Sequence, residues 1–141
     1  MYQKIVIVGH LGRDPEMRYA PNGNPVTSFS VATGRKYKGA DGQQVNETGW
    51  FRCSAWNRLA EVCNDYLKKG TKVLVEGRLA VDSKTGGPRI FKRSDGTMGC
   101  YFEIVVAEMR ILSSKEKEDG HSGGDGEFEY TDEGVDDDIP F

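Results

Sequence analysis

Residues 50–81 have the sequence WFRCSAWNRLAEVCNDYLKKGTKVLVEGRLAV, and this stretch decides the fold class. Residues 50–56 form a short, aromatic-rich run whose side chains alternate, which predicts a strand. Residues 57–69 repeat apolar side chains at helical spacing, and residues 71–81 are again rich in β-branched and apolar side chains. The stretch therefore predicts a single helix between two strands.

The predicted helix has a start signal, an apolar face and a stop signal. Asn57 is a suitable N-cap, and Gly70 is suited to end the helix. The apolar face is formed by residues at positions i, i+3, i+4, i+7 and i+8: Leu59, Val62, Cys63, Tyr66 and Leu67. We expect the helix to pack on the strands through this face.

Three further strands and three connections complete the predicted order. Strands are expected at residues 4–11, 25–33 and 100–112. The connections are a turn-rich segment at 12–24, a polar loop at 34–48 and a Gly- and charge-rich hairpin region at 82–99. The order β-β-β-α-β-β is that of an OB-fold, an all-β, five-stranded Greek-key barrel with a helix at one end. A six-stranded sandwich is the alternative.

Charge divides the chain into a basic body and an acidic tail. Residues 113–141 hold eleven Asp/Glu and two Lys, a balance of −9, and the rest of the chain balances at +6. A basic body suggests a polyanionic partner, with a solvated body and a merely solubilising tail as the alternative. We expect one domain at residues 1–112, a disordered acidic linker at 113–135 and a partner-binding tip at 136–141.

The strand at residues 50–56 is the most informative part of the body for function. Its residues divide by alternation into two faces: Trp50, Arg52, Ser54 and Trp56 on one, and Phe51, Cys53 and Ala55 on the other. The second face suits a core, whereas the first carries two indoles with a guanidinium between them. Unpaired bases stack on such rings while Arg and Lys contact phosphates. The alternative is that both tryptophans are buried in a second core or an interface.

Two predicted loops combine an aromatic ring with cations. Tyr37 lies within the sequence RKYK at 35–38, and Phe91 lies within RIFKR at 89–93. This pattern is typical of a nucleic-acid track, in which Arg35 and Lys92 would contact phosphates. The alternative for each loop is a ring that folds back onto the barrel.

Patterns typical of catalysis or metal binding are not found in the sequence. Cys53, Cys63 and Cys100 lack metal-ligand spacing, and the two histidines, His10 and His121, join no such cluster. No phosphate loop, nucleophile elbow or acid–base pair is recognisable. We therefore expect no enzyme activity, no metal and no cofactor. Reduced cysteines, the lack of an apolar run of ~18–20 residues and the lack of a leader indicate a cytosolic protein.

Several motifs resemble those of the bacterial single-stranded DNA-binding protein (SSB) family. They follow the family's order: VGHLGRDPEMRY with PNG at 8–23, WFR at 50–52, LAE and YLKKG within 59–70, VEGRL at 75–79, and the acidic tip at 136–141. The resemblance implies an OB-fold homotetramer that wraps single-stranded DNA without sequence preference. It also implies a place in the bacterial cytoplasm, at the nucleoid.

The resemblance also implies roles for individual residues. Four aromatic residues match stacking positions: Tyr37, Trp50, Trp56 and Phe91. Four basic residues match positions that contact phosphate: Lys4, Arg52, Arg58 and Lys69. Ala80 and Asp82 stand where relatives often carry basic residues, so the DNA path along that hairpin is expected to differ.

In the tail, the resemblance implies docking of the tip on replication, recombination and repair proteins. The tip consists of Asp136, Asp137, Asp138, Ile139, Pro140 and Phe141. Phe141 would insert its ring and pair its carboxylate with a cation, while the aspartates contact a basic rim. Two other functions stay open: an OB-fold RNA-binding or replication-restart accessory protein, and a structural β-barrel that binds no nucleic acid.

Overall fold

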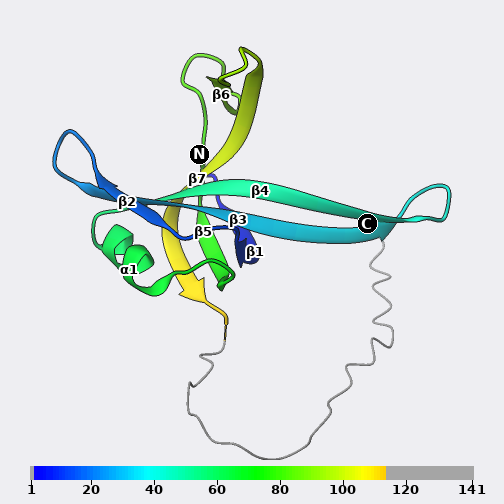
Figure 1. Ribbon diagram of the computed structural model, residues 1–141, viewed down its shortest axis with the longest axis horizontal. Helices are drawn as coiled ribbons and strands as arrows, with labels where there is room; N and C mark the ends of the chain where they lie inside the picture. The colour runs from blue at the N-terminus through cyan, green and yellow to red at the C-terminus, as the bar shows by residue number, and fades with distance from the viewer. Residues whose placement is uncertain (1, 114–141) are drawn as a thin grey trace, which may run out of the picture.

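The computed structural model describes residues 2–113, so the predictions for the tail, including the tip, lie outside the described residues. The described part contains seven strands and one helix. In chain order these are β1 (Ile5–Leu11), β2 (Glu16–Tyr19), β3 (Pro25–Lys38), β4 (Gln44–Trp56), α1 (Arg58–Tyr66), β5 (Lys72–Ala80), β6 (Arg89–Lys92) and β7 (Met98–Ile111). Figure 1 shows two hairpin arms, β3–β4 and β6–β7, projecting from a body that carries α1 on another side.

Five of the strands form a closed ring, in the order β1-β5-β7-β4-β3 and back to β1. Strand β1 closes the ring because it pairs with two strands. Most of its residues pair with β5, and its last two, His10 and Leu11, pair with Ala32 and Val31 of β3. All pairs in the ring are antiparallel except β4 with β7. The OB-fold prediction is confirmed, and a sandwich is excluded because β1 joins the two ends of the sheet.

The closing strand crosses β3 very closely at Gly9. A Cβ atom at this position would overlap the backbone carbonyl oxygen of Ala32 and press on a methyl of Val31. Any side chain would therefore hold the two strands apart, and glycine is needed there to let the backbones meet.

The barrel core consists of the inward faces of the five strands and one face of α1. Its buried residues are Ile7, Leu11, Phe29, Val31, Cys53, Ala55, Cys63, Leu67, Val73, Val75, Ile104 and Val106. Burial in this core raises the pKa of Cys53 and of Cys63 to about 12. Both therefore remain thiols at neutral pH, whereas Cys100 is exposed on β7.

The helix is shorter than predicted, and its ends differ from the sequence signals. Asn57 precedes α1 with a φ of 56° and makes no side-chain cap, so it turns the chain without capping the helix. The helix ends at Tyr66, before Gly70, because Leu67 turns to an extended conformation and enters the core. Tyr66, which was predicted on the apolar face of the helix, is 65% exposed, whereas Ala60, which was not, is buried. The Thr27 hydroxyl donates to the Ala60 carbonyl at 2.6 Å, tying α1 to β3.

The prediction of a polar loop at residues 34–48 was wrong. Strands β3 and β4 continue through it as a paired hairpin, from Gly34 opposite Thr48 to Lys38 opposite Gln44. The segment is polar because both faces of this arm lie mostly in solvent, so polarity here does not signal a loop. Gly42, with a φ of 78°, allows the tight turn at the tip.

The two other connections are partly strands. The turn-rich segment at 12–24 contains β2, which pairs with residues 25–28 of β3. The hairpin predicted at 82–99 is confirmed, since β6 pairs with residues 98–101 at the start of β7. These two short strands carry basic and aromatic side chains to the same side of the barrel.

Candidate nucleic-acid interface

The outer face of β4 presents two exposed indoles with an arginine between them. Trp50 is 54% exposed and Trp56 40% exposed, and Arg52 is exposed between them. Cys53 and Ala55 are fully buried on the other face, as alternation predicts. The alternative of a second core within this chain is therefore excluded for both tryptophans.

Ser54 departs from the predicted exposed face because it is buried beside the neighbouring strand β7. Its hydroxyl donates to a carboxylate oxygen of Glu103 at 2.6 Å. Strands β4 and β7 run parallel here, and Glu103 lies opposite Arg52. The face of β4 thus continues onto β7.

The Trp50 indole lies over the turn after β1. A Cβ atom on Gly12 would come within 2.5 Å of the indole ring, so the ring packs directly on this glycine. Gly12, Arg13, Ser30 and Trp50 line a recess of about 350 Å³. An aromatic face beside a guanidinium is the arrangement that a base with its phosphate requires.

A second groove, of about 300 Å³, is lined by residues of β2, β3, β4, β6 and β7 and of the turn after β1. Four arginines, two glutamates and a tyrosine line most of it: Arg13, Arg18, Arg52, Arg89, Glu16, Glu103 and Tyr101. Only Arg52 among these was predicted from the sequence. The sequence does indicate that Tyr101 and Glu103 share a face, because they are two residues apart in the last predicted strand.

Two neighbouring rings with a guanidinium group at each end extend from β4 across to the β6–β7 arm. The Arg52 guanidinium lies 4.4 Å from the centre of the Tyr101 ring. The Tyr101 and Phe91 rings are 5.8 Å apart, and Arg93 lies 5.6 Å from the Phe91 ring. The structure thus brings the predicted Phe91 into line with Arg52 through Tyr101, whereas Lys92, the next residue on β6, lies on the opposite face of that strand.

Tyr37 and Arg35 lie on the β3–β4 arm, outside this line. Both are an odd number of residues from Ala32, which pairs with Trp50, so they lie on the opposite face of β3. The Tyr37 hydroxyl donates to Glu47 at 2.9 Å, and Arg35 lies 4.9 Å from the ring. The hydrogen bond to Glu47 raises the pKa of the Tyr37 hydroxyl. The ring neither lies in a loop nor folds back onto the barrel.

The remaining predicted phosphate contacts are dispersed. Arg58 is exposed at the start of α1, and Lys69 is exposed after its end. The Lys69 backbone N–H donates to the Asp14 carboxylate at 2.8 Å, which ties the segment after α1 to the turn after β1.

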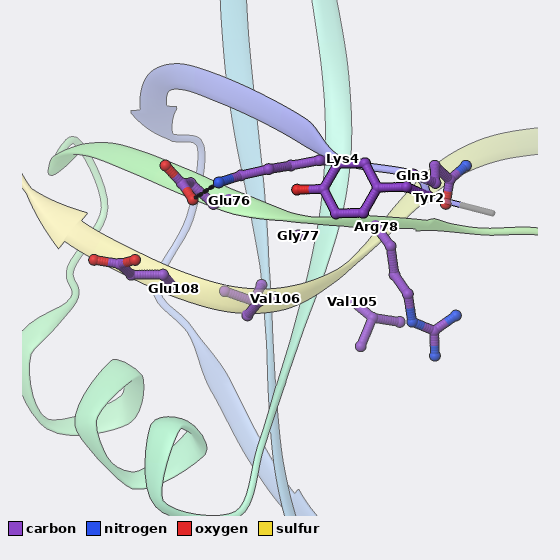
Figure 2. A pocket seen from close by; sticks show the side chains of 10 residues that line it. Tyr2, Gln3, Lys4, Glu76, Gly77, Arg78, Val105, Val106 and Glu108 are labelled. Carbon is purple, nitrogen blue, oxygen red and sulfur yellow. Dashed lines mark ion pairs between the residues drawn. The ribbon is translucent and has the colours of Figure 1, made fainter.

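Lys4 lies beside β5 and β7, where it forms an ion pair with Glu76 (Figure 2). The hydrogen bond to Glu76 raises the pKa of Lys4. The pair borders a cavity of about 390 Å³ that also contacts Tyr2 and Arg78. This cavity shares no lining residue with the two recesses beside Trp50 and Arg52.

Residues 2–113 contain neither a candidate metal site nor a helix that could span a membrane. No group of three or more His, Cys, Asp or Glu side chains in this part could hold a metal ion. The single helix of the same range is not long and apolar enough to cross a membrane.

Comparison with known proteins places the barrel in a sequence family. Residues 2–112 match the Single-strand binding protein family, SSB. A single-stranded DNA-binding protein of Neisseria meningitidis serogroup A is 38% identical over 117 residues, which cover 83% of this chain and 63% of the relative. The match thus spans less than two thirds of that relative's length.

Two further matches agree with this one. The single-stranded DNA-binding protein 1 of Chlorobaculum tepidum is 37% identical over 84% of this chain and 70% of its own. The crystal structure of a small single-stranded DNA-binding protein from Streptomyces coelicolor superposes with a TM-score of 0.63 and 26% identity, covering 79% of this chain and 95% of that one. The chain belongs to the single-strand binding protein family.

Proposed function

We propose that the protein binds single-stranded DNA without sequence specificity and carries out no reaction of its own. The observation that carries this proposal is the line of rings and guanidinium groups that starts at the exposed Trp50 and Arg52 and continues through the half-buried Tyr101 to the exposed Phe91. Bases of a single strand expose both faces and can stack on such rings, whereas bases in a duplex cannot. The names of the family relatives support the same ligand.

Binding would combine stacking with the release of counterions. Arg13, Arg18 and Arg52 line one groove and would neutralise phosphates along the strand, whereas Arg89 in the same groove is paired with Glu103. Arg35, Arg58, Lys69 and Lys92 would extend this path over the arms and the helix. Lys4 would join it only by leaving Glu76.

A titration that follows tryptophan fluorescence tests the proposal. Oligo-dT is expected to quench strongly, and duplex DNA of equal length is expected to quench weakly. The affinity should fall with salt, with a log–log slope of about −0.7 for each phosphate neutralised. Absence of quenching, or equal affinity for duplex, would contradict the proposal. Tighter binding of a matched RNA would favour the RNA-binding alternative.

We further propose that residues 113–135 act as a tether and that residues 136–141 recruit replication, recombination and repair proteins. Ile139, Pro140 and Phe141 support this role because apolar residues that follow an acidic run add nothing to solubility. The Asp136–Asp138 run would contact a basic rim on the partner and would also compete weakly with DNA for the barrel.

Deletion of Pro140 and Phe141 tests the tip. Binding to purified replication and repair proteins should be lost, while the affinity for oligo-dT stays equal or becomes tighter. Phe128→Ala is the matched control, because it removes a ring from the linker and should leave partner binding unchanged. Weaker DNA binding after the deletion would contradict this division of roles.

The proposed assembly is a homotetramer in the bacterial cytoplasm, associated with the nucleoid. Val6 and Val8 of β1 support self-association, because both are about half exposed on the outer face of the barrel. Phe102 of β7 is similarly exposed. Such apolar side chains suit an interface between copies of the chain.

A further inference from the structure

Glu103 is a carboxylate held within the arginine-lined groove. One of its oxygens accepts the Ser54 hydroxyl at 2.6 Å, and the other pairs with Arg89 Nε at 3.0 Å. Its side chain is 15% exposed, so it is fixed in place but still reachable from the groove. None of the binding roles described above requires an acidic group at this position.

The carboxylate makes this part of the groove unsuitable for phosphate. A phosphate beside Glu103 would meet a fixed negative charge, which the Ser54 and Arg89 contacts keep in place. Each carboxylate oxygen can accept two hydrogen bonds; one accepts the Ser54 hydroxyl, and the other is in the ion pair with Arg89. Glu103 therefore keeps acceptor capacity for a donor from a ligand.

The groove also provides a flat surface next to this acceptor. Tyr101 precedes Glu103 by two residues on β7 and so shares its face. Arg52 covers the Tyr101 ring at 4.4 Å, and Arg89 pairs with Tyr101 across β6 and β7. A planar ligand with an amino group would find stacking partners and a fixed acceptor together.

We propose that this groove takes one base of the bound strand and that Glu103 accepts a hydrogen bond from its exocyclic amino group. Cytosine offers an amino group where uracil and thymine present a carbonyl oxygen, which the carboxylate repels. This inference rests on the proposed function. It adds a bias towards amino-bearing bases at one position of an otherwise unspecific path.

Oligo-dC and oligo-dU of about 15 nucleotides, a length that suits one barrel, test the inference because their bases differ only on one edge, in the amino or carbonyl group at C4 and in the hydrogen that uracil carries on N3. The ratio of the Kd for dU to the Kd for dC should fall about tenfold in Glu103→Gln, since one hydrogen bond to a charged group is lost and the repulsion is removed. Glu108→Gln is the matched control, because it removes the same charge from β7 outside the groove. That control should leave the ratio unchanged.

Ser54→Ala shows whether a change in base preference comes from the Glu103 carboxylate itself or from a general loss of structure in the groove. It removes the hydrogen bond to Glu103 but keeps the carboxylate, so the ratio should stay within about twofold of the original value. Equal changes for both oligonucleotides in Glu103→Gln would indicate a phosphate at this position and overturn the inference, as would an unchanged ratio. Failure of the unaltered protein to bind either oligonucleotide would instead overturn the proposed function, and this inference with it.

Discussion

Replacement of Trp50 and Trp56 together by alanine is expected to weaken binding to oligo-dT roughly 10²- to 10⁴-fold, since each base–ring stack contributes ~1–3 kcal/mol. The two rings are six residues apart on β4, about 20 Å along the strand, so their effects should add. The single variants should each lose about the square root of the combined factor. Anisotropy of a labelled oligonucleotide is the suitable measurement, because the double variant contains no tryptophan.

Two further variants show whether stacking is the cause. Trp50→Phe keeps an aromatic face over Gly12 and should recover most of the affinity that Trp50→Ala loses. Tyr66→Ala is the matched control, since it removes an exposed ring from α1, away from the groove. If Tyr66→Ala weakened binding as much as Trp50→Ala, the outer face of β4 would not be the stacking surface.

This face could be predicted from the sequence because a strand alternates with a period of two. The pattern from Trp50 to Trp56 placed Cys53 and Ala55 inside and Arg52 outside, as observed. The same rule failed for Ser54, because its burial depends on a carboxylate that another strand supplies.

The groove around Glu103 could not be predicted because its parts come from five strands. Its geometry depends on the parallel pairing of β4 with β7 and on the short strands β2 and β6. No local pattern encodes that register. Arg18, Arg89 and Tyr101 were therefore visible in the sequence only as residues of turns, a loop and a strand.

Lys4 shows the same limit for charged residues. The family resemblance matched Lys4 to a phosphate-contacting position, and local sequence does not show that β5 places Glu76 beside it. The polar β3–β4 arm shows why a strand can be missed. The two strands stay paired as far as Tyr37 and Val45, but their side chains form no continuous apolar face, so the sequence resembles that of a loop. Both differences come from long-range pairing, which local sequence does not specify.

Gly9→Ala is expected to lower the free energy of unfolding by about 3 kcal/mol, at the upper end of the usual cost of overpacking. The added methyl would overlap the carbonyl oxygen of Ala32, which is backbone and cannot rotate away as a side chain would. Strand β1 can relieve the overlap only by leaving β3. That movement would break the closing pairs and draw Leu11, a buried core residue, out of the barrel.

Urea unfolding at a fixed protein concentration measures this effect, with the concentration held constant because association would also stabilise the fold. Gly34→Ala is the matched control: it adds the same methyl to β3, where no atom lies within 4 Å, and should change stability by at most about 0.5 kcal/mol. Equal stability of the two variants would show that β1 does not need a close approach to β3 at Gly9. A loss of stability in Gly9→Ala alone would show that this single crossing keeps the ring of five strands closed. The same crossing would then also keep Ala32 in position opposite Trp50.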